Sequence, residues 1–314
     1  MKKKKVFLII DANSLFHRAY HALPPLKTKK GELVNALYGF LLVFLKVLKE
    51  INPSYLAACF DYPAKTFRHQ QFKEYKATRP PTPQDLVSQI PKIKEVLRVF
   101  NVPVFEKKGF EADDLIGTIS KKLSKNSSLE TVILSGDSDI LQLIDKKTRV
   151  CFLTRGVKDV LLYGQKEVEQ KYQGLKPCQI DDFKALKGDP SDNIPGVKGI
   201  GEKTALGLIK EFGTLEDVYL NLEKLKPKLR DLLSRQKKEA LLSRSLLEIK
   251  KDVPIDFKLK DCQRKDYDLE KLKKVFEKYE FYSLMKKINK ERDIQGQGLD
   301  ESVQGKKSRQ ASLF

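Results

Sequence analysis

The sequence contains no tryptophan and only four cysteines among its 314 residues. The cysteines, at positions 59, 151, 178 and 262, form no CxxC pair and no cluster with histidine. This pattern argues against a disulfide scaffold and a zinc finger, and it favours a reducing cytoplasm.

Long hydrophobic runs are also missing. Val6–Ile10 follows a basic start but ends after five residues at Asp11, which is too short for the core of a signal peptide. The most apolar stretch, 33–48, is interrupted by Asn35 and Lys46 and falls short of a bilayer span. We therefore expect a cytoplasmic protein with no membrane partner.

Positive charge is abundant. The chain has 61 Lys and Arg against 42 Asp and Glu, a formal net charge of +19. Hydrophobic residues make up 40% of the sequence, so a sizeable core is possible. So large an excess of positive charge favours a polyanionic partner, nucleic acid above all.

Short apolar runs alternate with helical patterns in the first half of the chain. Strands are expected at Val6–Ile10, Tyr55–Phe60 and Thr131–Leu134, and helices at Leu33–Ile51, Gln84–Phe100 and Ala112–Leu123. This alternation predicts an α/β core over 1–175 with a parallel-rich central sheet covered by helices. Helical patterns dominate 176–288, and the polar composition of 289–314 predicts a flexible tail.

Each of the three expected strands is followed by an aspartate. In a parallel sheet these residues share the edge where ligands bind. Together with acidic clusters at 111–114, 136–139 and 188–193, they make nine candidate metal ligands: Asp11, Asp61, Glu111, Asp113, Asp114, Asp137, Asp139, Asp189 and Asp192. Two ordinary explanations stay open at this point, since Asp is common in turns and acidic residues suit the first turn of a helix.

Such a gathering of carboxylates would need cations. Two carboxylates ~4 Å apart repel each other by roughly 4 kcal/mol at an effective dielectric constant of 20. Oxygen ligands without His or Cys favour two Mg²⁺ or Mn²⁺ ions, which would clamp a phosphate during phosphodiester hydrolysis.

Two further segments suit a phosphate backbone. Basic residues between 65 and 79 are interleaved with aromatic ones and end at a proline-rich stretch, although a solvated helix face would look similar. The second segment, Gly196–Thr204, departs from a Walker A loop because Glu202 separates Gly201 from Lys203. It fits a helix–hairpin–helix that binds phosphates through backbone amides, and a plain interhelical turn remains an alternative.

The motifs Ile-Ile-Asp-Ala-Asn-Ser (9–14), Tyr-Lys-Ala-Thr-Arg (75–79), Glu-Ala-Asp-Asp-Leu (111–115), Gly-Asp-Ser-Asp (136–139) and the long string at 188–205 are specific together. Over residues 5–288 the chain resembles the 5′-nuclease domain of bacterial DNA polymerase I and the flap endonuclease superfamily. The resemblance implies a PIN-like fold with a helical arch at about 62–83.

The resemblance also implies roles for individual residues. Asp11, Asp61, Glu111 and Asp113 would surround one metal ion, and Asp114, Asp137, Asp139, Asp189 and Asp192 would serve the second. Lys76 and Arg79 would steer the scissile phosphate and, with Asp113 and Asp137, form the catalytic set. DNA would be bound by Arg68, Lys73, Tyr75, Lys76, Arg79, Gly196, Lys198, Gly199, Gly201, Lys203 and Thr204, with Tyr75 stacked on the terminal base and K⁺ at the hairpin.

The implied activity is 5′-3′ exonuclease and flap cleavage of DNA with flaps, nicks or free 5′ ends, in replication and repair. The last residues, with Gln310, Leu313 and Phe314, look like the peptide that binds the bacterial sliding clamp. Because no polymerase domain follows, a separate DNA polymerase is a further expected partner. The alternatives are a non-catalytic DNA-binding protein of the same fold and a related ribonuclease.

Overall fold

The computed structural model describes residues 4–157 and 159–294, and its centre is a single six-stranded sheet. The strands lie in the order β3-β2-β1-β4-β5-β6, and every neighbouring pair is parallel except β5 and β6. The strands span Lys5–Asp11 (β1), Tyr55–Cys59 (β2), Val104–Phe105 (β3), Leu129–Ser135 (β4), Thr148–Arg155 (β5) and Asp159–Tyr163 (β6). The predicted α/β fold with a parallel-rich sheet is confirmed.

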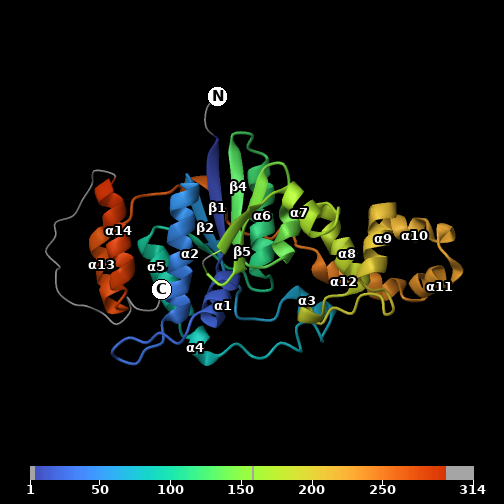
Figure 1. The fold of residues 1–314 in the computed structure, drawn as a ribbon, viewed down its shortest axis with the longest axis horizontal. Helices are drawn as coiled ribbons and strands as arrows, with labels where there is room; N and C mark the ends of the chain where they lie inside the picture. The colour runs from blue at the N-terminus through green and yellow to red at the C-terminus, as the bar shows by residue number, and fades with distance from the viewer. Residues whose placement is uncertain (1–3, 158, 295–314) are drawn as a thin grey trace.

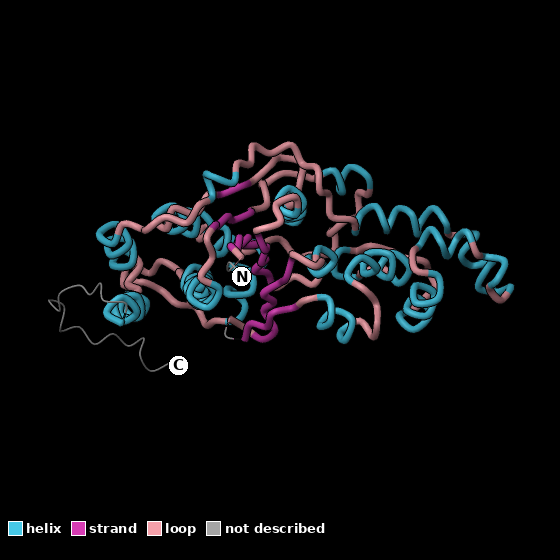
Figure 2. The backbone as a smooth tube through the Cα atoms, turned by 90° about the horizontal axis from the view of Figure 1, so that it is seen from above, coloured by secondary structure: helices cyan, strands magenta, loops and turns pink. Residues whose placement is uncertain are grey.

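Helices cover both faces of this sheet (Figures 1 and 2). Those of the first half are α1 (Ala12–Ala22), α2 (Asn35–Ile51), α3 (Phe67–Gln71), α4 (Gln84–Val87), α5 (Ile90–Val99), α6 (Ala112–Ser124) and α7 (Gln165–Lys171). The second half contains α8 (Ile180–Lys187), α9 (Glu202–Phe212), α10 (Leu215–Leu220), α11 (Pro227–Arg235), α12 (Lys237–Leu247), α13 (Leu269–Lys278) and α14 (Tyr282–Ile294).

Alternation along β1 explains the layers. Successive strand residues point to opposite faces, so Leu8 and Ile10 join a core with α1, α2 and α5, while Phe7 and Ile9 join another with α6. All four side chains are fully buried. A strand buried on both faces has to be apolar throughout, and this requirement produces the short apolar runs of the sequence.

The helix predicted over Gln84–Phe100 is in fact two helices, α4 and α5. Proline at position 91 lacks a backbone N–H and disfavours helical geometry in the residue before it, so the helix breaks there. The buried side chain of Gln89 accepts hydrogen bonds from the backbone N–H groups of Ala36 (2.9 Å) and Leu37 (3.2 Å). The break therefore supplies a cap for the N-terminus of α2.

The predicted helical arch over 62–83 contains one short helix, α3, and is otherwise turns and extended chain. The part after α3 lies against the carboxylates, where the backbone N–H of Lys76 donates to the carbonyl of Asp192 (2.9 Å). This segment therefore forms a wall of the site.

The C-terminal helices lie at opposite ends of the molecule. In Figure 1, α9, α10 and α11 extend to one side of the sheet and α13 and α14 lie at the other. Leu272, Phe276 and Leu284 of α13 and α14 belong to the same core as α2 and α5. No helix in the described residues is both long and apolar enough to cross a membrane.

Candidate active site

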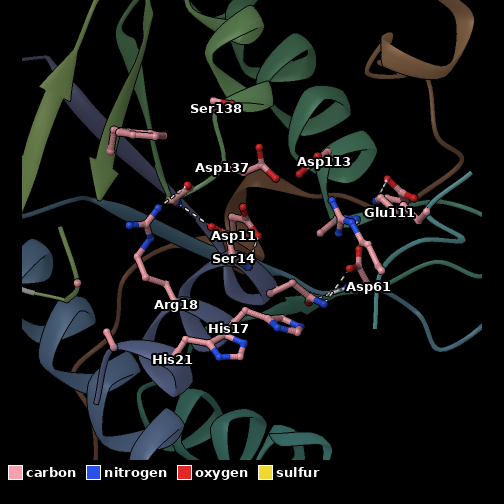
Figure 3. Close-up of a pocket in the computed structure, with 18 residues that line it drawn as sticks. Asp11, Ser14, His17, Arg18, His21, Asp61, Glu111, Asp113, Asp137 and Ser138 are labelled. Carbon is pink, nitrogen blue, oxygen red and sulfur yellow. Dashed lines mark hydrogen bonds and ion pairs between the residues drawn. The ribbon is translucent and has the colours of Figure 1, made fainter. Parts of the chain in front are cut away.

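Carboxylates from three strand ends and one helix line a cavity of about 800 Å³. Asp11 is the last residue of β1, Asp61 comes two residues after β2, and Asp137 comes two residues after β4. Figure 3 shows Asp11, Asp113 and Asp137 around the middle of this cavity, with Asp61 and Glu111 to one side. The parallel sheet thus gathers side chains that are up to 126 residues apart in the chain.

Asp11 is held in place by its neighbours. Its Oδ2 accepts a hydrogen bond of 2.6 Å from Ser135 Oγ, and its Oδ1 accepts one from the backbone N–H of Ser14 at the start of α1. The hydroxyl of Ser135 also accepts from the backbone N–H of Asp137 (2.9 Å). One buried serine therefore links the end of β1 to the loop after β4.

Asp61 faces the N-terminus of α6. Its Oδ1 accepts from the backbone N–H of Ala112 (2.7 Å) and its Oδ2 from Asn13 Nδ2 (2.8 Å). Free amides at a helix N-terminus stabilise an anion. The carboxylate is thereby fixed toward the cavity beside Glu111.

The carboxyl groups in the middle of the cavity are crowded, and this disfavours their charged forms. Burial, and then repulsion by Asp137 and Asp11, raises the pKa of Asp113 well above its usual range, and within the described chain this residue has no ion pair. Burial likewise raises the pKa of Asp11 to about 7, against the lowering effect of Ser135. A divalent cation would remove this cost.

A second, smaller cavity of about 280 Å³ adjoins the first. Its acidic lining consists of Asp137, Asp139, Asp189 and Asp192, and both Asp137 and Arg79 line the two cavities. Asp189 precedes a short 3-10 helix, Pro190–Asp192, and accepts from the backbone N–H and the hydroxyl of Ser191. The nine predicted carboxylates, Asp114 apart, fall into these two adjoining groups.

Basic side chains of the predicted set also reach the carboxylates. Lys76 donates to Glu111 (3.0 Å), and Arg79 forms an ion pair with Asp192. Lys184, which the sequence analysis missed, contacts both Asp139 and Asp189. Lys73 is exposed and faces solvent.

Three sequence-based assignments need correction. Asp114 lies outside both cavities, because its carboxylate binds Arg68 through two hydrogen bonds of 2.8 Å and also accepts from the backbone N–H of Lys250. Arg68 is only 2% exposed, so it is unable to contact DNA. Tyr75 is only 3% exposed and its hydroxyl donates to Glu111, so in this structure its ring is not free to stack on a base.

The glycine hairpin lies between α8 and α9. Gly196 is buried and has φ of +64°, and a Cβ there would lie 2.2 Å from the backbone nitrogen of Gly188. The two backbones therefore approach each other as only glycine permits. The remaining predicted hairpin contacts are exposed, namely Lys198, Gly199, Gly201, Lys203 and Thr204.

The donor set suits hard divalent ions, since it consists of carboxylate oxygens. As the side chains stand, no group of three or more His, Cys, Asp or Glu residues in 4–157 and 159–294 could hold a metal ion. Like charges repel one another, and Lys76, Arg79 and Lys184 form ion pairs with four of the carboxylates. Binding of ions would require these pairs to open.

Sequence analysis missed a row of residues on α1. His17, Arg18 and His21 line the large cavity (Figure 3), and Arg18 Nη2 donates to the carbonyl of Gly136 (2.9 Å). Burial, together with the positive charges of His21 and Arg79, lowers the pKa of His17. The signal was their spacing on one helical face directly after Asp11.

Two family models match the chain. Residues 6–173 match the N-terminal resolvase-like domain of 5′-3′ exonucleases, and residues 175–270 match the C-terminal SAM fold of the same enzymes. The chain belongs to the 5′-3′ exonuclease family. The resemblance found in the sequence is confirmed.

Curated relatives of this 5′-3′ exonuclease family member include DNA polymerases I. The polymerase of Caldicellulosiruptor bescii is 42% identical over 301 residues, covering 95% of this chain and 34% of the polymerase. The polymerase of Bacillus caldotenax is 41% identical over 289 residues, which cover 92% of this chain and 32% of that polymerase. The chain thus spans about a third of the length of the curated relatives it matches.

Solved structures with the same fold include nucleases. T5 5′-exonuclease with bound divalent zinc ions superposes with a TM-score of 0.62 at 23% identity, covering 78% of this chain and 90% of the other. The catalytic core of Rad2 in complex with DNA substrate superposes with a TM-score of 0.56 at 18% identity, covering 88% of this chain and 88% of the other. At this identity the likeness establishes the fold.

Proposed function

We propose that the chain hydrolyses DNA phosphodiester bonds at or near 5′ ends and flap junctions with the help of two divalent ions, in replication and repair. The observation that carries this proposal is the crowding of the carboxyl groups of Asp11, Asp113 and Asp137 in one cavity, beside a second group of carboxylates. Family membership supports it, and so do the structural neighbours, of which T5 5′-exonuclease has bound zinc ions and the Rad2 catalytic core is in complex with DNA substrate.

The first ion would be held by Asp11, Asp61, Glu111 and Asp113, and the second by Asp137, Asp139, Asp189 and Asp192. Mg²⁺ or Mn²⁺ ions at these positions would supply Lewis-acid stabilisation of the phosphoryl oxygens. Asp137 lines both cavities and would tie the two positions together. Ser135 would keep Asp11 oriented throughout.

Lys76 and Arg79 would position the phosphate. Both now pair with carboxylates of the site, and an incoming phosphate offers each of them a new anionic partner. Further from the cavity, the exposed amides and basic groups of the hairpin, with K⁺ bound by its carbonyls, would hold the duplex without reading its sequence.

The test is cleavage of a 5′-labelled flap duplex by the full chain. Asp113→Asn and Asp137→Asn should each lower the rate by roughly 10³-fold, the loss expected when a metal ligand disappears. Both variants should still bind the flap in Ca²⁺. The exposed carboxylate of Asp256 lies outside both cavities, so Asp256→Asn is the matched control and should cleave normally.

The same assay separates the alternatives. A chain that binds the flap in Mg²⁺ without cutting it would be a structure-specific DNA-binding protein. Preference for an RNA flap over a DNA flap would make it a ribonuclease. Turnover retained by both variants would remove the two-ion proposal.

A sliding clamp and a separate DNA polymerase are proposed partners. The clamp proposal depends on Gln310, Leu313 and Phe314, which lie outside the described residues. Deleting 310–314 should abolish capture by an immobilised clamp and leave cleavage of free flaps unchanged. Capture by the shortened chain would contradict it.

A further inference from the structure

Lys184 projects from the last turn of α8 into the second group of carboxylates. Its Nζ donates to Asp189 Oδ2 (2.7 Å) and forms an ion pair with Asp139. The side chain is only 11% exposed. An ammonium group thus lies between two carboxylates, one following β4 and the other following α8.

Burial opposes a positive charge on Lys184, but the two neighbouring carboxylates stabilise it. Desolvation lowers the pKa of Lys184, and attraction by Asp139 and Asp189 overcomes it, so the net shift is upward. The ammonium is therefore a fixed part of the site at any physiological pH.

Lys187, one turn further along the same helix, provides the contrast. Its side chain is 28% exposed, and its Nζ donates to Glu202 at 3.2 Å. Although Lys187 lines the same cavity, none of its hydrogen bonds in the described structure goes to Asp139 or Asp189. The two lysines share a helix and a cavity and differ in contact with the carboxylates.

We propose that Lys184 is a resident cation that competes with the second divalent ion for Asp139 and Asp189. The same oxygens cannot bind the ammonium and a metal ion at full strength, and two cations close together repel. Lys184 therefore acts as a positioning residue that keeps the affinity for the second ion lower than the affinity for the first. This inference rests on the proposed two-ion function.

The consequence is an order of assembly. The first ion enters among Asp11, Asp61 and Asp113, none of which forms an ion pair with a lysine or arginine in the described structure. The second ion enters readily once a DNA phosphate supplies additional negative charge and gives Lys184 an alternative partner. Lys184 thereby couples loading of the second ion to arrival of the substrate.

The experiment measures Mn²⁺ binding to the full chain by electron paramagnetic resonance, without DNA. In Lys184→Met the weaker Mn²⁺ site should tighten by at least about tenfold, since a competing charge is gone, while the stronger site stays within about twofold. Lys184→Arg keeps the cation and should bind like the parent. Lys187→Met removes a charge from the same helix and should shift the weaker site by less than about twofold.

The outcomes are distinguishable. Weaker or unchanged binding of the second Mn²⁺ in Lys184→Met overturns the role of Lys184 while leaving two-ion binding intact. A parent chain that binds no Mn²⁺ overturns the proposed function itself. If Lys184→Met fails to fold by circular dichroism, Lys184→Gln decides by the same criterion, and loss of folding in both would show that the lysine is structural.

Discussion

Both Nη atoms of Arg68 donate to the carboxylate of Asp114 at 2.8 Å, and both side chains are buried. The guanidinium also donates to the carbonyls of Leu246 and Glu248 at the end of α12. One arginine of α3 thus connects the N-terminus of α6 with the C-terminus of α12. The wall beside the cavity depends on this pair.

Arg68→Met should therefore act on stability. Removing one partner of a buried pair leaves an uncompensated charge, and we expect the free energy of unfolding to fall by about 3–5 kcal/mol in urea titrations. Arg68→Met with Asp114→Leu removes both charges and should recover part of the loss. A single variant as stable as the parent but weaker in DNA binding would restore the original assignment.

Lys76→Ala should act on rate. Lys76 lies beside Glu111 at the edge of the large cavity, where it would contact the reacting phosphate. We expect kcat for flap cleavage to fall about 10²-fold while Kd for the flap in Ca²⁺ changes little. The exposed Lys73→Ala is the control and should weaken binding slightly with kcat unchanged. Equal losses of rate and affinity in Lys76→Ala would argue against the role.

Gly196→Ala should disrupt the hairpin. The new Cβ would collide with the backbone at Gly188, and φ of +64° is strained for alanine, so unfolding free energy should fall by about 2–5 kcal/mol. Gly207, in the middle of α9, has open space around it, and Gly207→Ala should stabilise by about 0.5–1 kcal/mol. Similar effects of the two changes in thermal unfolding would contradict the close approach.

Asp182 should make stability depend on pH. Burial raises the pKa of this residue of α8 to about 6, against the attraction of Arg244. Since the ordinary pKa is 3.8, the folded chain binds more protons than the unfolded chain between these values. The contribution of Asp182 to stability therefore falls as pH rises from about 4 to 6. In urea titrations at pH 4.5 and 7, the free energy of unfolding should decline less between the two pH values in Asp182→Asn than in the parent.

The sequence predicted the strands that end at the site, but it did not predict which side chains face the cavity. Asp113 and Asp114 are neighbours on α6, yet one lines the cavity and the other is buried against Arg68, 46 residues earlier in the chain. Only tertiary packing separates them. Helix α1 escaped prediction because its polar residues face the cavity, and β6 because Leu161 and Leu162 are exposed at an edge of the sheet.

Helices α13 and α14 have a practical consequence for anyone who divides this chain. Phe276, Tyr279 and Phe281 fill the core against α2 and α5, and the hydroxyl of Tyr279 donates to Glu95. A fragment ending near residue 175 would lack these side chains, so the apolar surface of α2 and α5 that they cover would be exposed to water and prone to aggregate. Limited proteolysis at the glycine hairpin should thus yield two nicked pieces that stay together on a sizing column.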